Sequence, residues 1–138
     1  MPDFGERLLV AILDQSGDAI IFANNAGIVQ IWNQAAVSLF GYSPKEAIGA
    51  SMDLIIPEKL RAAHWTGFHR AMETGMTRLK GRPTVTRATH RSGARLYVEM
   101  TFAVVRADDG TVLGAVAVAR DATERYEQAR AQRAAPAT

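Results

Sequence analysis

Two strand-like segments in the second half of the chain constrain its fold more than any other feature. Polar and apolar residues alternate along residues 96–104 (LYVEMTFAV), which is the period of a β-strand with one buried face. After a turn at residues 107–110 (ADDG), residues 112–119 (VLGAVAVA) are almost entirely apolar, which is typical of a strand at the centre of a sheet. The chain is therefore predicted to be built on a β-sheet.

The other segments complete an α+β pattern. Further strands are predicted at residues 19–23, 28–32 and 82–89, the first two joined by a hairpin turn that contains Asn and Gly. Helical periodicity and cap residues predict helices at residues 4–13, 34–40, 44–48, 57–75 and 121–134. This order predicts a five-stranded antiparallel sheet with helices on one face and further helices flanking it at both ends.

The length of the chain predicts one domain. A chain of 138 residues is long enough to bury a single core and too short for two. We expect an N-terminal helical cap at residues 1–17, a core at residues 18–121 and a C-terminal helical linker at residues 122–138.

Composition excludes several classes of function. The net charge of +2 comes from 16 basic and 14 acidic residues that are interspersed, so neither a nucleic-acid-binding stripe nor a polybasic membrane patch is visible. The absence of cysteine excludes disulfides, thiolate metal sites and cysteine-based catalysis. No apolar run is long enough to span a bilayer and the N-terminus lacks a signal-peptide pattern, so we expect a cytoplasmic protein.

The predicted helix at residues 57–75 places one ionisable side chain on its apolar face. At about 100° per residue, Leu60, His64 and Phe68 fall on one stripe, whereas Arg70 points away from it. A histidine in this position is either a satisfied core residue or a ligand for a metal or cofactor, because neutral imidazole suits both roles. The segment alone leaves both interpretations open.

Three motifs make the chain resemble the PAS family. They are Asn33 followed by residues 40–43 (FGYS) after the first hairpin, Gly49 after the next short helix, and the terminal residues 120–125 (RDATER). The resemblance covers nearly the whole chain. It implies a sensory domain in which a five-stranded sheet and its facing helices enclose a small cavity. It also implies that the terminal Asp and Thr couple the sheet to an exit helix leading to an output domain.

Within that family, the central helix resembles a narrower group, the haem-binding PAS domains of bacterial oxygen sensors. The match lies in residues 55–68 (IIPEKLRAAHWTGF), and it places His64 at the proximal iron ligand and Arg70 near the haem propionates. It implies a haem b cofactor, with its iron bound by His64, that senses a diatomic gas or a redox state.

The opposite side of the expected cavity departs from this group. Thr84 stands where the sensor kinases have a distal arginine, and Arg82 stands where the sensor phosphodiesterases have a methionine ligand. Arg82 or Arg87 could approach a bound gas instead, but neighbouring strand residues alternate faces and the sequence does not say which points inward. Besides His64 and Arg70, the residues expected to contact the cofactor are Leu60, Phe68, Met100, Phe102 and Ala117.

Two alternatives remain open. A photosensor that needs a cysteine adduct is excluded, but a cysteine-free flavin-binding PAS domain is not. The stronger rival is a cofactor-free dimerisation and signal-relay module, for which the N-terminal helix offers a homodimer contact through Leu8, Leu9, Ile12 and Leu13. No carboxylate pair, Gly-rich phosphate loop or serine elbow is visible, so the chain itself is not expected to be an enzyme.

Overall fold

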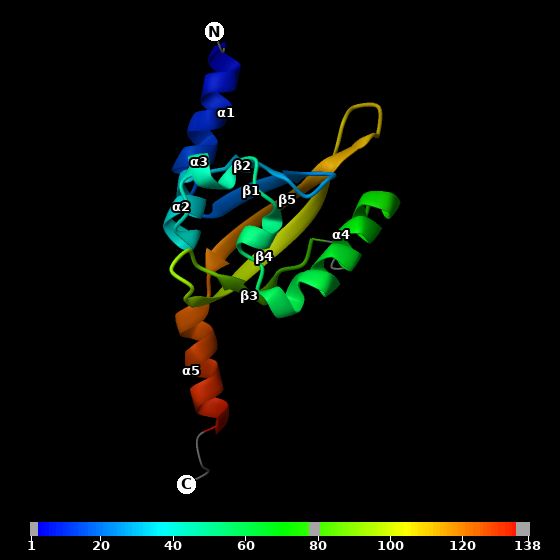
Figure 1. Ribbon diagram of the computed structural model, residues 1–138. Helices are drawn as coiled ribbons and strands as arrows, with labels where there is room; N and C mark the ends of the chain where they lie inside the picture. The colour runs from blue at the N-terminus through cyan, green and yellow to red at the C-terminus, as the bar shows by residue number, and fades with distance from the viewer. Residues whose placement is uncertain (1–2, 78–80, 135–138) are drawn as a thin grey trace.

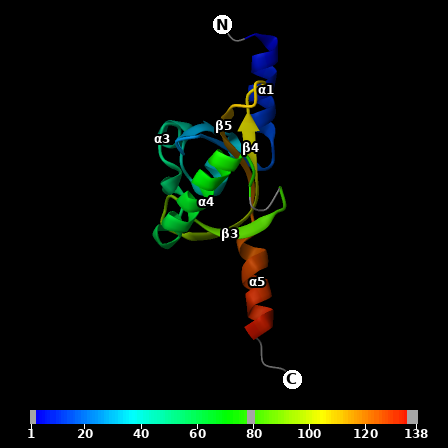
Figure 2. The same cartoon turned by 90° about the vertical axis from the view of Figure 1, so that its right-hand side faces the viewer.

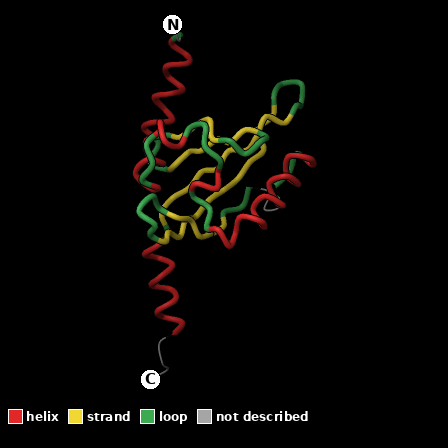
Figure 3. Tube along the Cα trace, viewed as in Figure 1, coloured by secondary structure: helices red, strands yellow, loops and turns green. Residues whose placement is uncertain are grey.

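The computed structural model describes residues 3–77 and 81–134, which form one sheet with helices on one face and at both ends (Figures 1 and 2). The strands are β1 (Ala19–Asn24), β2 (Val29–Trp32), β3 (Thr84–Thr89), β4 (Arg95–Arg106) and β5 (Val112–Asp121). The helices are α1 (Phe4–Gln15), α2 (Gln34–Phe40), α3 (Pro44–Ala47), α4 (Arg61–Thr74) and α5 (Thr123–Ala134), with 3-10 turns η1 at Met52–Leu54 and η2 at Glu58–Leu60. The chain thus runs from a hairpin through a group of helices to three more strands (Figure 3).

The apolar strand β5 lies at the centre of the sheet. The strand order is β2-β1-β5-β4-β3, and every neighbouring pair is antiparallel. Ala117 of β5 pairs with Ile21 of β1 on one side and with Phe102 of β4 on the other. These findings confirm the predicted α+β class, the five strands and the central position of residues 112–119.

Asn33 ties the first hairpin to the helices. Its Oδ1 accepts hydrogen bonds from the amides of Ala36 (3.1 Å) in α2 and Ile20 (2.8 Å) in β1. Its Nδ2 donates to the carbonyl oxygens of Leu13 (2.6 Å) and Asp18 (3.1 Å). The sequence indicated only the helix cap. The further bonds arise because the side chain is buried, at 2% exposure, and buried polar groups require partners.

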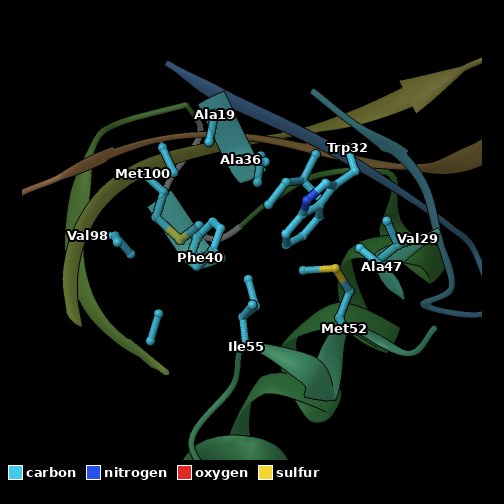
Figure 4. Packing of buried hydrophobic residues seen from close by; sticks show 14 of the residues in the cluster. Ala19, Val29, Trp32, Ala36, Phe40, Ala47, Met52, Ile55, Val98 and Met100 are labelled. Atoms are coloured by element: carbon cyan, nitrogen blue, oxygen red, sulfur yellow. The ribbon is translucent and has the colours of Figure 1, made fainter. Parts of the chain in front are cut away.

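The hydrophobic core lies between the sheet and the helices that follow the first hairpin (Figure 4). The rings of Trp32 and Phe40 pack with centroids 5.5 Å apart. Met52 and Ile55 approach them from the segment after α3, and Met100 approaches from β4 (Figure 4). Burial of each such side chain contributes about 1.5–3 kcal/mol, so this cluster fixes the helices against the sheet.

The flanking helices α1 and α5 project from opposite ends of the sheet (Figures 1 and 2). Neither contains a buried residue.

The ends of three predicted elements shift by a few residues. The 3-10 turn η2 precedes α4, β3 begins after Pro83, which has no N–H for the ladder, and α5 begins only at Thr123 because Asp121 still pairs with Val98.

Candidate ligand-binding site

A cavity separates α4 from the sheet. It has two lobes, of about 430 and 370 Å³, which share Ala63, His64, Thr84 and Phe102 in their lining. Lobes of this size fall in the range of small-molecule and cofactor sites, about 300–1,000 Å³. His64 therefore lies where the two lobes meet.

Apolar side chains form most of the walls. The first lobe is bounded by Ile55 and Leu60 on the helical side and by Met100 on β4. The second lobe extends along α4, where Phe68 and Ala71 line it. A bulky apolar ligand would thus gain from leaving water, and a few polar groups would decide its orientation.

The imidazole of His64 is the polar group of α4 that faces this cavity. Its Nδ1 is completely buried, and neither ring nitrogen forms a hydrogen bond with any residue in the described ranges. The rings of Trp65 and Phe68 lie beside it, with centroids 4.8 and 6.1 Å away. An unpartnered buried polar atom costs about 1–3 kcal/mol, so the site gains stability if a ligand engages the imidazole.

The surroundings of His64 favour its neutral form. Burial lowers the pKa of His64 below its ordinary value of 6.5, the nearby Asp53 carboxylate opposes this by raising it, and His69 lowers it further. At pH 7 the ring is therefore neutral and keeps a nitrogen lone pair, which is the state required of a metal ligand.

The structure brings most of the predicted contact residues to the cavity. Leu60 and Met100 line the first lobe, Phe68 lines the second, and Phe102 lines both. Two predicted residues lie outside this lining. Ala117 is buried in β5, where it pairs with Phe102, and Arg70 is exposed on α4.

The register of β3 separates the polar residues that face the cavity from those that do not. Thr84 pairs with Met100, and Thr86 pairs with the buried Val98, so both threonines share the inner face. Their hydroxyls form no hydrogen bond with the described residues, and both threonines line the first lobe.

The two arginines considered from the sequence differ in their relation to the cavity. Arg87 pairs with Tyr97, on the face of β3 opposite to Thr84 and Thr86, yet it belongs to the lining of the first lobe, and its buried Nε has no hydrogen-bond partner among the described residues. Arg82 precedes β3 and is exposed. The polar residues of β3 in the lining of the first lobe are thus Thr84 and Thr86 on the inner face, together with Arg87.

Sequence reasoning missed one side chain beside the site. The Asp53 carboxylate accepts a hydrogen bond from Nε1 of Trp65 at 2.7 Å and acts on His64 through its charge. Asp53 lies in η1, eleven residues before His64, and no periodic pattern links the two. Only the capping hydroxyl of Ser51, which accepts from the Asp53 amide, signals a turn there.

The outer face of β4 contacts the exit helix. The Tyr97 ring stacks on Tyr126 of α5 with centroids 3.9 Å apart, and Glu99 forms an ion pair with Arg125 at 3.0 Å. On the same strand, Met100 faces the cavity. One strand thus contacts both the cavity and α5, on opposite faces.

Within residues 3–77 and 81–134, no three His, Cys, Asp or Glu side chains gather into a possible metal site. Nor does any helix in these ranges have the length and apolar character to cross a membrane.

Comparison with known proteins gives one family and several relatives. The family described as the PAS fold matches residues 13–127. Among solved structures, a PAS domain of a protein from Colwellia psychrerythraea superposes with a TM-score of 0.75 at 22% identity, covering 86% of this chain and 98% of that one. At this identity the superposition supports the fold alone.

Two curated relatives have names that state a function. The oxygen sensor protein DosP of Escherichia coli is 28% identical over 116 residues, which is 84% of this chain and 14% of DosP. The sensor protein FixL of Bradyrhizobium diazoefficiens is 29% identical over 128 residues, which is 92% of this chain and 25% of FixL. The chain therefore spans only a small part of the length of either relative.

Proposed function

The chain belongs to the PAS family, and from that premise we propose that it is a sensory domain that binds haem b through His64. The observation that carries the proposal is the His64 imidazole, which is neutral, lacks a hydrogen-bond partner among the described residues and faces an apolar cavity. Neutral imidazole is a suitable axial ligand for haem iron. The relationship to an oxygen sensor and to a sensor protein supports the same assignment.

The lining of the cavity suits a large planar group. Leu60, Phe68, Met100 and Phe102 supply apolar contacts in the two lobes on either side of His64. Haem bound there would supply an iron atom that binds diatomic gases or changes its redox state. We propose that Ala117 leaves room beside Phe102, because the two residues are paired across β5 and β4 and Ala117 carries only a methyl group.

Polar residues at the rim and the facing wall would orient the cofactor and its ligand. We propose that the exposed Arg70 guanidinium, which lies on α4 outside the cavity lining, would pair with a propionate. On the sheet, Thr84 stands where the related sensor kinases have an arginine, and Thr84 and Thr86 both offer hydroxyl donors to the first lobe. The distal chemistry of this chain is therefore proposed to rest on neutral donors.

The signal is proposed to leave through β4 and α5. Residues 1–17 would then act as a helical cap, residues 18–121 as the sensing core, and residues 122–138 as a linker to an output domain in a cytoplasmic homodimer. The domain itself binds and regulates, and any catalytic activity would reside in the output domain. The shared contacts of β4 with the cavity and with α5 support this route.

An absorption spectrum tests the cofactor assignment. The chain expressed with haem supply should show a Soret band, and His64→Ala should lose it or shift it. His69→Ala is the matched control, because His69 is exposed on the same helix and should leave the band unchanged. A colourless chain after reconstitution, or a His64→Ala spectrum identical to that of the unmodified chain, would contradict the proposal.

One observation favours a second candidate, a cofactor-free dimerisation and relay module. Leu9 and Ile12 of α1 are 63% and 57% exposed, and α1 has no buried residue, so much of its apolar side is open to a partner although its end contacts α2. Dimerisation is compatible with haem binding. The second candidate stands alone only if reconstitution gives neither a haem spectrum nor a flavin spectrum.

A further inference from the structure

Helix α4 carries His64 but is not buried against the sheet. None of its residues is buried, because the two lobes lie between it and the strands. Most helices in a protein derive their stability and orientation from a packed apolar face. Something other than the sheet must therefore fix the rotation of α4 about its axis.

Trp65 links α4 to two other segments of the chain, η1 and the turn between β1 and β2. Its Nε1 donates a hydrogen bond of 2.7 Å to Oδ1 of Asp53 in η1. Its six-membered ring lies over Gly27 in the turn between β1 and β2. A Cβ atom at Gly27 would lie 2.2 Å from Cη2 and 2.3 Å from Cζ3 of the indole. The turn can therefore accept the ring only because residue 27 has no side chain.

This contact determines where the neighbouring side chain points. Successive residues of a helix are rotated by about 100°, so fixing the direction of Trp65 also fixes that of His64. The two rings touch edge to face with centroids 4.8 Å apart. Rotation of α4 that moved His64 out of the cavity would also pull the indole off Gly27 and away from Asp53.

We propose that Trp65 is a positioning residue which, with Asp53 and Gly27, anchors α4 to the β1–β2 turn and so aims His64 into the cavity. The inference rests on the proposed function in that His64 is the residue that holds the cofactor. The opposite end of α4 has a separate attachment, an exposed hydrogen bond from the Arg106 guanidinium to the carbonyl oxygen of Gly75.

A size-swap experiment on the cofactor-free chain tests the anchor. Gly27→Ala introduces a methyl group where the indole lies, so amide exchange in residues 61–74 should become roughly tenfold faster. Gly93→Ala is the matched control. Gly93 also has a positive φ, +90° against +79° for Gly27, but nothing lies within 4 Å of its added methyl group. It should leave exchange in α4 unchanged.

Rescue separates positioning from general loss of stability. Trp65→Phe removes the two clashing carbons together with the hydrogen bond to Asp53, and it should speed exchange in α4 by itself. In a chain that already carries Trp65→Phe, adding Gly27→Ala should then accelerate amide exchange in α4 no more than Gly93→Ala accelerates it in the unmodified chain. Additive effects of the two substitutions, or unchanged exchange in Gly27→Ala, would overturn the anchor.

The haem spectrum gives the second readout. In the unmodified chain and in Gly93→Ala the Soret band should be the same, whereas Gly27→Ala should shift or weaken it. If no variant binds haem, the proposed function fails while exchange still decides the anchor. If all variants bind haem with one spectrum and exchange equally, the anchor fails while the proposed function stands.

Discussion

The hydroxyl of Thr123 bonds to both backbone groups of Tyr97. It accepts a hydrogen bond from the Tyr97 amide at 3.0 Å and donates one to the Tyr97 carbonyl oxygen at 3.3 Å. The Ala122 amide donates to the same carbonyl at 2.8 Å, and Oδ1 of Asp121 accepts from the Thr123 amide at 2.8 Å. The first turn of α5 is therefore bonded to the strand that lines the cavity.

Replacing Thr123 by Val should weaken this junction without affecting the cavity. The Tyr97 amide loses its acceptor, while the Tyr97 carbonyl keeps the bond from Ala122, so the free energy of unfolding should fall by about 1–3 kcal/mol in urea. Cofactor binding should persist, and regulation of the output domain in the full-length protein should be lost. The control is Thr101→Val, which changes a threonine within β4 itself and should alter neither the free energy of unfolding nor regulation. Intact regulation in Thr123→Val would refute the proposed route.

Replacing Asn33 by Ala should destabilise the whole domain. The substitution removes a helix cap and leaves half-buried partners on β1 and before it without bonds from a buried side chain, so the free energy of unfolding should fall by about 3 kcal/mol. Asn25→Ala is a suitable control. Asn25 is exposed and makes one bond, of 3.3 Å, to Val112, so its loss should cost less than about 1 kcal/mol. Equal losses would contradict the role of Asn33 as a buried junction.

The stability of the cofactor-free chain should depend on pH through His64. Burial lowers the pKa of His64 in the folded chain, so the unfolded chain binds a proton more readily. Neutral His64 makes its full contribution to the free energy of unfolding when the pH is above the ordinary histidine pKa of 6.5. This contribution declines as pH falls below that value, and it levels off below the pKa of His64 in the folded chain. Urea unfolding between about pH 8 and 5 measures this, and His64→Gln should remove that part of the slope. His69→Gln should retain it.

Charges on the apolar side of α1 should separate a homodimer. Leu8 and Ile12 lie about 40° apart on the helix, and the double substitution Leu8→Glu/Ile12→Glu would bury two carboxylates in a dimer contact. Sedimentation should then show a monomer where the unmodified chain is dimeric. Val10→Glu provides the control, because Val10 is equally exposed but lies on the other side of the helix. A monomeric unmodified chain would contradict the dimer.

Local signals predicted most of the fold. The capping box at Ser43 and Glu46 is present as expected, and Asn33 caps α2. The alternating segment 96–104 lies within β4, and the apolar segment 112–119 lies within the central strand. These features depend on residues close together in the sequence, and that is why they could be recognised without the tertiary structure.

The site was predicted less completely. Helical spacing identified Leu60, His64 and Phe68, because residues four apart share one face. It gave no information on Asp53, which meets the helix only after the chain has turned. Nor did the sequence place Thr86 on the inner face. Strand β3 is short and has polar residues on both faces, so its pattern does not show which face meets the cavity.

The sequence by itself determined the strands, the capped helices and the amphipathic helix with a histidine on its apolar side, since these follow from backbone preference and from the period of apolar residues. The tertiary structure alone decided which face of β3 meets the cavity, through the pairing of Thr84 with Met100. It also decided that Trp65 rests on Gly27, a contact between residues 38 apart in the chain. Such contacts depend on strand register and on the shape of the packed chain, which no local pattern specifies.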